Sequence, residues 1–520
     1  MRPRTALVFS LAIATTTVSA KFSLGSRDTG TDYFNICVYH SSFVLCGPSD
    51  FQTGLTAIYH VNDIHAHLDE ITTSGTDCTK PESGCYGGYA RIKAAVDAGR
   101  ATVNNSLFLN MGDEFQGTLF YSYYGGEIIA DTLNQLNFDA MTLGNHEFDQ
   151  GDAYLGQFLN NLTIPIVCAN VDSQDKTINS TVKPYHVFPQ YKLAVVAVTT
   201  DTIPTISNSD KSTTFADPIE TMQYWADYVY AHEDVERIIA MTHIGYEDDI
   251  AMAQNTTGIH LIIGGHSHTL LGDMAGAAGP YPTIETNLDG EEVFVVTAYR
   301  YGEYLGYLDV QFDPTGKIVG LTGGPIHLTN QTAQDADLEA QIKAWRVPFD
   351  AFGNEVIGNT TVLLNHNGCK TGEWCMLNGG GIRVDIPVGN VTRGDVINAF
   401  PFGNAVTEVS LSGRDLWNIF AGAVAGVSVF NGAKVVTWPQ ISQGVRVTYN
   451  PTTKTLIDLE VGQGDEMVTV DFGATYLMSD YVVLDTLDEV LTAYIQRLGS
   501  VDEELQNRVV PVNDTTPVQS

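Results

Sequence analysis

The stretch Ala140-Met141-Thr142-Leu143-Gly144-Asn145-His146-Glu147-Phe148-Asp149 joins an apolar run to a polar motif through a single glycine. The apolar half is typical of a buried strand. The polar half carries an amide, an imidazole and two carboxylates within a few residues. Ligands in open α/β sheets collect beyond the carboxyl ends of the strands, so this stretch predicts an α/β fold with a site at a strand end.

Apolar runs lead into polar motifs at four other places in the chain. The runs are residues 56–61, 106–111, 237–241 and 259–263, and they precede Asp63-Ile64-His65, Gly112-Asp113, Thr242-His243 and Gly264-Gly265-His266-Ser267-His268. Carboxylate, amide and imidazole groups bind divalent transition metals, and one carboxylate can bridge a pair of them. Any one of these residues alone is more often structural. All five motifs together predict one converging two-metal site.

The segments Gly112-Asp113-Glu114-Phe115-Gln116-Gly117 and Gly144 to Asp149 carry a family resemblance. Over about residues 56 to 510 the chain resembles the calcineurin-like metallophosphoesterases and, within them, the 5'-nucleotidase family. The resemblance implies two divalent metal ions, zinc first, with manganese, cobalt or iron as alternatives. The implied ligands are Asp63, His65 and His268 for one ion, Asn145, His243 and His266 for the other, and Asp113 as the bridge.

The same resemblance implies that His146 is not a ligand but faces the phosphate, with Asp149 orienting its ring. Two metals would make hydroxide available near neutral pH for an in-line attack on phosphorus. Protonated His146 would then stabilise the charge that develops on the phosphoryl oxygens and the leaving group.

A second motif, Asn378-Gly379-Gly380-Gly381-Ile382-Arg383, matches the substrate-domain signature of 5'-nucleotidases. Glycines such as Gly380 and Gly381 allow the backbone to approach a ligand closely, while Asn378 can bond a base and Arg383 an anion or ribose hydroxyls. Phe402 and Tyr481 are the expected aromatic clamp for the base. The alternative for both rings is a place in the hydrophobic core.

The second domain departs from the family at two positions. Between Cys369 and Asn378 the chain lacks a longer helical segment, and Lys370 stands where the family places a substrate-binding arginine. After Tyr481 the family's Gly-Gly-Asp-Gly loop is replaced directly by Val482-Val483-Leu484-Asp485. These departures predict weakened base selectivity and leave the metal ligands untouched.

The chain is expected to be an α/β protein of two domains: a metallophosphoesterase β-sandwich flanked by helices, then an α+β substrate-binding domain. Residues 335–352 alternate charge with Leu338, Ile342 and Trp345, which predicts an amphipathic connecting helix. The expected division is a signal peptide at 1–20, an extension at 21–54, the catalytic domain at 55–330, the linker helix at 331–353, the substrate domain at 354–512 and a tail at 513–520.

The first residues, an apolar stretch before Val18-Ser19-Ala20, predict a cleavable signal peptide and a secreted, extracellular enzyme without a membrane anchor. A formal net charge of −35 disfavours nucleic-acid polymers and acidic membranes as partners. Seven cysteines allow three disulfides. The shortest pairs are Cys37 with Cys46, Cys78 with Cys85 and Cys369 with Cys375, which leaves Cys168 as a buried thiol.

The leading hypothesis is a secreted 5'-nucleotidase that releases phosphate from nucleoside 5'-phosphates. An apyrase, a nucleotide-sugar hydrolase or a cyclic-nucleotide phosphodiesterase would have a similar metal site. A noncatalytic nucleotide-binding protein on the same fold is the alternative from another class. The intact ligand set argues against that alternative, and the two missing segments argue for it.

Overall fold

A computed structural model of the chain divides it into two compact units, Met1–Leu55 and Thr56–Ser520. In the second unit it describes residues 57–73, 75–78, 84–103, 105–313, 315–362, 376–402, 404–408, 411–430, 432, 434–435, 438–441, 444–463, 466–476, 482–501 and 509–511. In the first unit it describes backbone strands only, and most of the expected signal peptide lies outside them.

The first unit contains a three-stranded antiparallel sheet in the order β3-β4-β5. Its strands are β3 (Ser19–Ser26), β4 (Asp32–His40) and β5 (Phe43–Cys46), and two short strands, β1 (Ala12–Ile13) and β2 (Thr16–Thr17), pair separately. Cys37 and Cys46 are register partners across β4 and β5. This backbone register is compatible with the expected disulfide between them.

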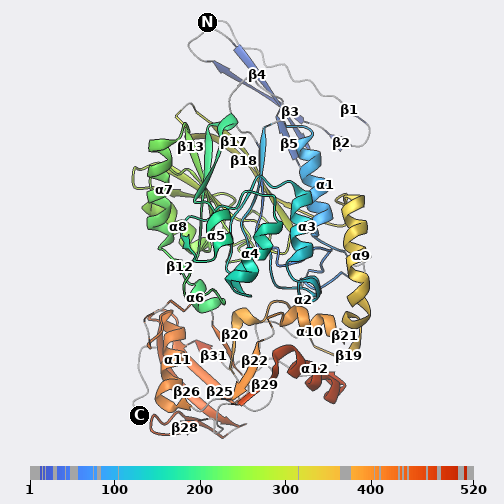
Figure 1. Cartoon of the computed structure of the whole chain (residues 1–520), viewed down its shortest axis with the longest axis vertical. Coiled ribbons are helices and arrows are strands. Elements are labelled where there is room, and N and C mark those ends of the chain that lie inside the picture. The colour runs from blue at the N-terminus through green and yellow to red at the C-terminus, as the bar shows by residue number, and fades with distance from the viewer. Residues whose placement is uncertain are drawn as a thin grey trace. The chain divides into compact units, whose positions relative to one another are not determined.

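Two mixed sheets form the core between residues 57 and 327 (Figure 1). One has the order β18-β17-β6-β7-β8 and the other β10-β11-β13-β14-β16-β15. Strands β6, β7 and β8 run parallel, as do β11, β13, β14 and β16. The bounds are β6 (Ala57–Val61), β7 (Ser106–Asn110), β8 (Ala140–Met141), β17 (Tyr304–Phe312), β18 (Ile318–His327), β10 (Tyr185–Phe188), β11 (Leu193–Thr199), β13 (Arg237–His243), β14 (Leu261–Ile263), β15 (Thr283–Thr286) and β16 (Glu292–Val296), with a separate pair β9 (Val171–Asp172) and β12 (Thr214–Phe215).

Helices cover one face of each sheet. Side chains of α1, α3 and α4 pack with Phe108 of β7, whereas those of α7 and α8 pack with Val196 of β11 and Ala240 of β13. The start of α7 shows how the local sequence favours a helix. Pro218 is its first residue, and the Asp217 side chain caps it by accepting the Glu220 N–H at 2.9 Å. The bounds are α1 (Tyr89–Arg100), α2 (Leu119–Tyr124), α3 (Glu127–Leu136), α4 (Asp152–Asn161), α5 (Lys176–Thr181), α6 (Ile203–Ile206), α7 (Pro218–His232) and α8 (Tyr246–Asn255).

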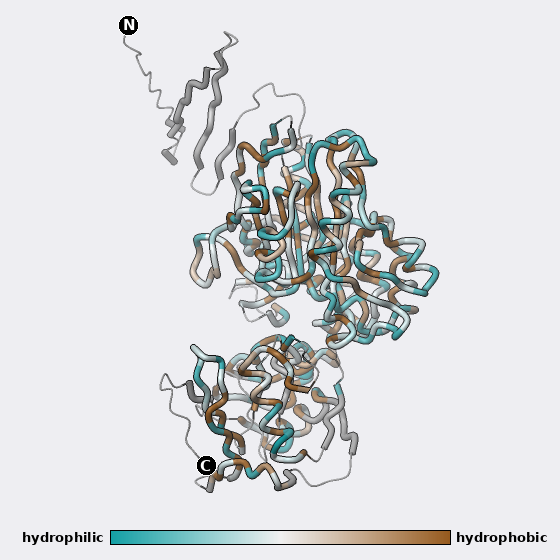
Figure 2. The backbone as a smooth tube through the Cα atoms, turned by 90° about the vertical axis from the view of Figure 1, so that its left-hand side faces the viewer, coloured by the Kyte–Doolittle hydropathy of each residue, from teal (hydrophilic) through white to brown (hydrophobic). Residues whose placement is uncertain are grey.

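The other faces of the two sheets are buried as well. All seven residues of β11 are buried, although only alternate ones pack with the helices. His60 of β6 bonds the Tyr281 hydroxyl, just before β15, with 2.8 Å between Nε2 and the oxygen, which joins the two sheets. Figure 2 shows hydrophobic colouring along these inner strands. The expected sandwich between helices is confirmed.

The connecting helix is α9 (Ala336–Gly353), which is shifted by one residue from the amphipathic stretch 335–352 and begins five residues after the expected start of the linker helix at 331. Asp335 caps it by accepting the Leu338 N–H at 2.9 Å. Leu338 and Ile342 are buried, as their spacing predicted, and Trp345 packs partly buried against the same core. Arg346 of α9 forms ion pairs with Asp69 and Asp77, which fixes the helix to the loop after β6.

The chain after α9 forms a second α+β domain, as expected. Its largest described sheet has the order β27-β26-β25-β31, and the predicted strand at 444–449 is β25 (Val445–Asn450). The remaining bounds are β19 (Val356–Thr360), β20 (Met376–Asn378), β21 (Gly389–Thr392), α10 (Arg393–Ala399), β22 (Ala405–Glu408), β23 (Leu411–Ser412), α11 (Gly413–Ala425), β24 (Pro439–Ile441), β26 (Thr455–Gln463), β27 (Glu466–Thr469), β28 (Thr475–Tyr476), β29 (Val482–Thr486), α12 (Leu487–Leu498), β30 (Ser500–Val501) and β31 (Val509–Pro511).

Candidate active site

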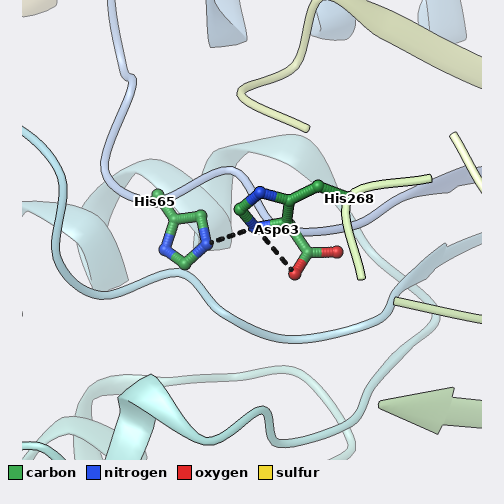
Figure 3. A group of neighbouring side chains, drawn as sticks. All are labelled: Asp63, His65 and His268. Carbon is green, nitrogen blue, oxygen red and sulfur yellow. Dashed lines mark hydrogen bonds and ion pairs between the residues drawn. The ribbon is translucent and has the colours of Figure 1, made fainter. Parts of the chain in front are cut away.

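The five motifs meet where β6, β7 and β8 of one sheet and β13 and β14 of the other end. Three groups of side chains place possible metal-binding atoms within 4.8 Å of one another. They are Asp63 with His65 and His268, His65 with Asp113 and His146, and Asp113 with His243 and His266. Figure 3 shows the first group, in which Asp63 and His65 follow β6 and His268 follows β14. The convergence expected from the strand ends is therefore present.

The backbone is strained at most of the expected metal ligands. The φ angles of five of the expected ligands lie in the left-handed region, where a side chain costs roughly 1 to 2 kcal/mol. They are Asp63 (54°), His65 (52°), Asp113 (60°), His266 (80°) and His268 (52°). Such strain persists only where the surrounding structure enforces it, and it gathers at functional sites.

Asp113 lies between the two outer groups. Its Oδ2 is 3.0 Å from Nε2 of His243 and 3.7 Å from Nε2 of His65. Its Oδ1 accepts the backbone N–H of His146 at 2.9 Å. One oxygen thus faces imidazoles of both groups, and the other accepts a backbone N–H, an arrangement that is compatible with a carboxylate that bridges two ions.

Backbone carbonyls orient the imidazoles. His65 Nδ1 lies 3.1 Å from the Phe115 carbonyl oxygen, and His243 Nδ1 lies 2.6 Å from that of Met111. A proton on each Nδ1 leaves the Nε2 lone pair free for another partner. Within the first group, Nε2 of His65 and Nε2 of His268 are 3.0 Å apart.

The protonation equilibria favour metal binding. Burial lowers the pKa of His266 to about 3 and that of His268 to about 4, so both rings are neutral at pH 7. Burial opposes ionisation of Asp63, but hydrogen bonding to His268 and the charge of His243 hold its pKa below the usual value. Neutral imidazoles and ionised carboxylates are the forms that bind metals.

His243 differs from the other imidazoles. Burial alone would lower its pKa, but the Asp113 carboxylate raises that pKa to about 10. Positive charge is therefore favoured beside Asp113, and a proton or a metal ion can supply it. The buried Asn145 Oδ1 at the site has no hydrogen-bond partner among the described residues. Buried polar atoms rarely stay unpaired, so this amide oxygen fits a ligand of a divalent cation.

His146 and Asp149 form the expected pair. His146 Nδ1 is 2.7 Å from Asp149 Oδ2, and the other carboxylate oxygen accepts the Ser207 hydroxyl at 2.7 Å. Burial opposes protonation of His146, but the carboxylates of Asp149 and Asp113 raise its pKa above the ordinary value. The ring is therefore held in one orientation and favoured in its charged form.

Glu147 has a structural role at the site that the sequence analysis did not predict. Its carboxylate accepts the backbone N–H groups of Asp113 at 3.0 Å, Glu114 at 2.7 Å and Gly144 at 2.6 Å. It is fully buried and bonds two loops that follow different strands. In the sequence, the only indication of this role was the position of Glu147 in the motif Gly144 to Asp149, between His146 and Phe148.

The structure brings two of the expected substrate residues to this site. Arg383 Nη2 lies 2.9 Å from His65 Nε2 and 3.5 Å from His268 Nε2. Phe402 stacks on His146, with ring centroids 5.2 Å apart, and the Arg383 guanidinium carbon is 5.5 Å from the Phe402 centroid. Phe402 is therefore beside the candidate acid and is only half-buried.

The other substrate residues are described in part. Gly380 and Gly381 form a 3₁₀ turn that follows Asn378, the last residue of β20, whose side chain lies outside the described residues. Tyr481 and Lys370 also lie outside the described residues. Strand β29 begins at Val482 and pairs with β22, so a strand directly follows Tyr481.

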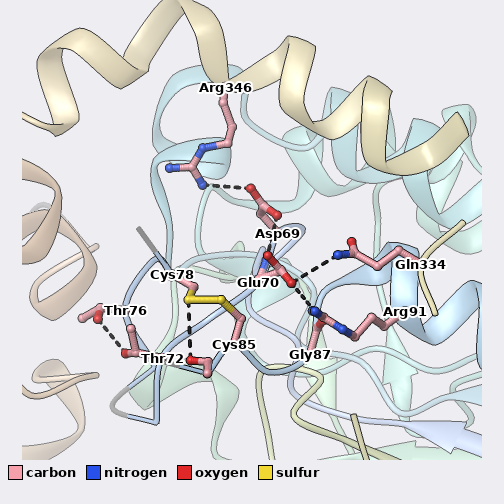
Figure 4. The surroundings of a disulfide bond; sticks show 11 residues. Asp69, Glu70, Thr72, Thr76, Cys78, Cys85, Gly87, Arg91, Gln334 and Arg346 are labelled. Carbon is pink, nitrogen blue, oxygen red and sulfur yellow. Dashed lines mark hydrogen bonds and ion pairs between the residues drawn. A yellow bond between two sulfur atoms is a disulfide. The ribbon is translucent and has the colours of Figure 1, made fainter. Parts of the chain in front are cut away.

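One of the three expected disulfides is confirmed. Cys78 and Cys85 form it within the connection between β6 and α1 (Figure 4). Cys168 is a buried free thiol, as expected. Cys369 and Cys375 lie outside the described residues.

The chain was compared with protein families, curated proteins and solved structures. The calcineurin-like phosphoesterase family matches residues 56–270, and the C-terminal domain of 5'-nucleotidases matches residues 350–485. A snake venom 5'-nucleotidase of Naja atra is 30% identical over 87% of this chain and 98% of its own. The 5'-nucleotidase of Homo sapiens is 32% identical over 80% and 77%.

A solved structure supports the same relationship. The crystal structure of a 5'-nucleotidase precursor from Thermus thermophilus has a TM-score of 0.79 and 29% identity, and the match covers 88% of this chain and all of that one. Calcineurin-like metallophosphoesterases bind divalent metals, and the His and Asp groups described above fit such a site. The chain therefore belongs to the 5'-nucleotidase family of metallophosphoesterases and is a phosphoric monoester hydrolase.

Proposed function

We propose that the protein is a secreted 5'-nucleotidase that hydrolyses nucleoside 5'-phosphates to nucleosides and inorganic phosphate. The observation that carries this proposal is the position of Arg383, within 2.9 Å of His65 in the candidate metal site. A cation from the nucleotidase C-terminal domain therefore lies where a phosphate ester would meet the metal ligands.

Seven residues would hold two divalent ions, with zinc favoured by the neutral imidazoles and the carboxylates. The ligands would be Asp63, His65 and His268 for one ion, Asn145, His243 and His266 for the other, and Asp113 for both. Such ions, when bound, lower the pKa of water and polarise phosphoryl oxygens. The protein's own contribution is the fixed placement of Asp113 and of the Nε2 atoms.

His146 would act on the developing charge. Its Nδ1 is occupied by Asp149, so Nε2 is the atom that can donate a proton or hydrogen bond to a phosphoryl or leaving-group oxygen. The carboxylate of Asp149 keeps the ring from rotating and favours the protonated form. General acid catalysis of this kind contributes roughly 10² to 10⁴ in rate.

Arg383 and Phe402 would bind the substrate, together with Asn378, Gly380, Gly381 and Tyr481. The guanidinium can form charge-assisted hydrogen bonds to phosphate or ribose oxygens. An ion bound through His65 Nε2 would compete with Arg383 for that nitrogen, which leaves the guanidinium for the anionic substrate. Phe402 can stack on any base because every base has a π-face.

Secretion is part of the proposal and rests on the N-terminal sequence. None of the helices among the described residues combines the length and apolar character needed to cross a bilayer. Expression of the full chain in a secretory host, followed by N-terminal sequencing of the protein in the medium, tests it. A mature end near Lys21 is expected, and retention of Met1 would contradict it.

Phosphate release from a panel of substrates tests the activity. The panel contains nucleoside mono-, di- and triphosphates, a nucleotide sugar and a cyclic nucleotide, each with zinc, manganese, cobalt or chelator. We expect metal-dependent release from 5'-monophosphates. Faster release from triphosphates or from the cyclic nucleotide would replace the proposal with an apyrase or a phosphodiesterase. Binding without turnover in every metal would indicate a noncatalytic protein.

A further inference from the structure

Tyr301 lies in the short connection between β16 and β17, outside all the motifs singled out from the sequence. Its side chain is 2% exposed, and its φ of 57° is in the left-handed region. A bulky residue rarely adopts this conformation unless surrounding contacts enforce it. The contacts that hold Tyr301 in this conformation therefore indicate the role of this residue.

One set of contacts joins Tyr301 to the candidate metal ligands. Its backbone N–H donates to the Asp63 carbonyl oxygen at 2.8 Å. Its ring makes edge-to-face contacts with the rings of His65 and His268. The ring centroids are 5.9 Å apart in each pair. Tyr301 therefore contacts all three members of the first metal-binding group.

The hydroxyl group of Tyr301 makes a different contact. It donates to the Arg383 backbone carbonyl oxygen at 3.0 Å. Arg383 is in the nucleotidase C-terminal domain, 82 residues further along the chain. A single side chain thus bonds the substrate-binding segment while its ring and backbone contact the metal-binding loops.

The ring cannot easily turn away from this position. His67 stacks on it with ring centroids 4.0 Å apart, and the Arg300 guanidinium carbon lies 4.6 Å from its centroid. A Cβ atom on Gly75 would be 2.8 Å from Tyr301 Cε2, so the backbone there also lies against the ring. Gly75 lies between Thr72 and Thr76, whose hydroxyl oxygens are 2.8 Å apart, and shortly before the Cys78–Cys85 disulfide (Figure 4).

We propose that Tyr301 is a positioning residue that sets the place of Arg383 relative to Asp63, His65 and His268, and so determines affinity for the phosphate end of the nucleotide. The inference rests on the proposed function. The bond goes to the Arg383 carbonyl, so the backbone is fixed while the guanidinium keeps its own freedom to meet an anion. His67 and Arg300 hold the ring in place, so loss of the hydroxyl bond should change the position of Arg383 and leave the metal ligands where they are.

The experiment compares Tyr301→Phe with Tyr304→Phe in the full chain. Tyr301→Phe removes only the hydroxyl and keeps the stacked ring. Tyr304 is a buried tyrosine of the same segment whose described ring contacts are with Tyr299 and His327. We expect Tyr301→Phe to raise KM for AMP about 3- to 10-fold with kcat and bound metal unchanged, and Tyr304→Phe to leave KM unchanged.

A double-mutant cycle with Arg383→Ala tests whether Tyr301 acts through Arg383. We expect Tyr301→Phe to have no further effect on KM in the Arg383→Ala protein. Fully additive effects, an unchanged KM in Tyr301→Phe, or a loss of metal in that variant would overturn the proposal.

A binding measurement separates this inference from the proposed activity. Titration with a nonhydrolysable phosphonate analogue of AMP gives Kd whether or not the protein turns over AMP. A parent protein that binds the analogue without hydrolysing AMP would contradict the nucleotidase activity, while a roughly 3- to 10-fold weaker Kd in Tyr301→Phe would still support the role of Tyr301. Absence of analogue binding by the parent protein would overturn both.

Discussion

The carboxylate of Glu147 accepts the backbone N–H of Asp113 at 3.0 Å, so the loop after β8 holds the loop after β7. The same carboxylate also accepts the N–H groups of Glu114 and Gly144. The candidate bridging residue is thereby fixed twice, through this bond to its backbone and through the His146 N–H bond to its side chain.

We expect Glu147→Gln to lower both metal content and stability. The amide replaces one oxygen with a donor that faces a backbone N–H, and an unpaired buried group costs about 1 to 3 kcal/mol. Metal analysis and thermal unfolding measure the two effects. Glu127→Gln, at an exposed position in α3, is the control. Full metal content in Glu147→Gln would show that the loops hold Asp113 without this bond.

Asp113→Ala should abolish turnover and remove bound metal. In the proposed two-metal site, the substitution would take the bridging ligand from both ions at once, and neither ion would keep its full ligand set. Elemental analysis and phosphate release measure the loss, and chelation of the unaltered protein should reproduce it. Asp131→Ala, at an exposed position in α3, is the control. Full activity of the unaltered protein in excess chelator would contradict a two-metal mechanism.

His146→Ala and Arg383→Ala should separate chemistry from binding. The first should lower kcat about 10²- to 10⁴-fold while both metals stay bound, because in the proposed mechanism His146 is a proton donor and not a ligand. The second should raise KM roughly 10- to 100-fold, since hydrogen bonds to a charged group contribute about 1.5 to 3 kcal/mol. Steady-state kinetics and metal analysis distinguish them. Metal loss in His146→Ala would mean that this ring is a ligand.

Cys168 should resist alkylation in the folded protein. Burial raises the pKa of its thiol to about 12, so almost no thiolate is present near neutral pH. Iodoacetamide labelling followed by peptide mapping measures this, with the unfolded chain as the reactive control. Rapid labelling of the native protein would show that the thiol is accessible and ionised.

Base identity should change kcat/KM little. The family resemblance leads us to expect a Gly-Gly-Asp-Gly loop after Tyr481, where the chain has Val482-Val483-Leu484-Asp485 instead. Hydrogen bonds from such a loop would reject a wrong base. The proposed stacking on Phe402 would tolerate every base. We expect AMP, GMP, CMP and UMP to agree within about tenfold, compared with roughly 10⁴-fold where a site reads hydrogen-bonding groups. A steep preference for one of them would place the selectivity elsewhere in the second domain.

The metal-binding cluster could be predicted because its residues share a chemical type and follow strand ends. Strand positions also agreed with the structure to within two residues. Strand β8 stops at Met141, two residues before the expected end, because its last pairing partner is Asn110, the final residue of β7. Pairing with a neighbour, which a single apolar run does not encode, sets that boundary.

The contacts of Tyr301 and Glu147 could not be predicted in the same way. Tyr301 reads as an ordinary core aromatic, and its partners Asp63 and Arg383 are far away in the sequence. Glu147 reads as one more carboxylate in a polar motif, although it accepts three backbone N–H groups. The stacking of Phe402 on His146 likewise arises only from the folded arrangement.

The left-handed backbone at Asp63, His65, Asp113, His266 and His268 has a consequence for sequence drift. Glycine is the residue that this conformation accommodates without strain, so replacing any of the five with glycine should relieve roughly 1 kcal/mol of local backbone energy. Selection for stability alone would therefore push these positions toward glycine. This chain instead carries a carboxylate or an imidazole at each of these positions, so its backbone energy is higher where the candidate metal ligands lie.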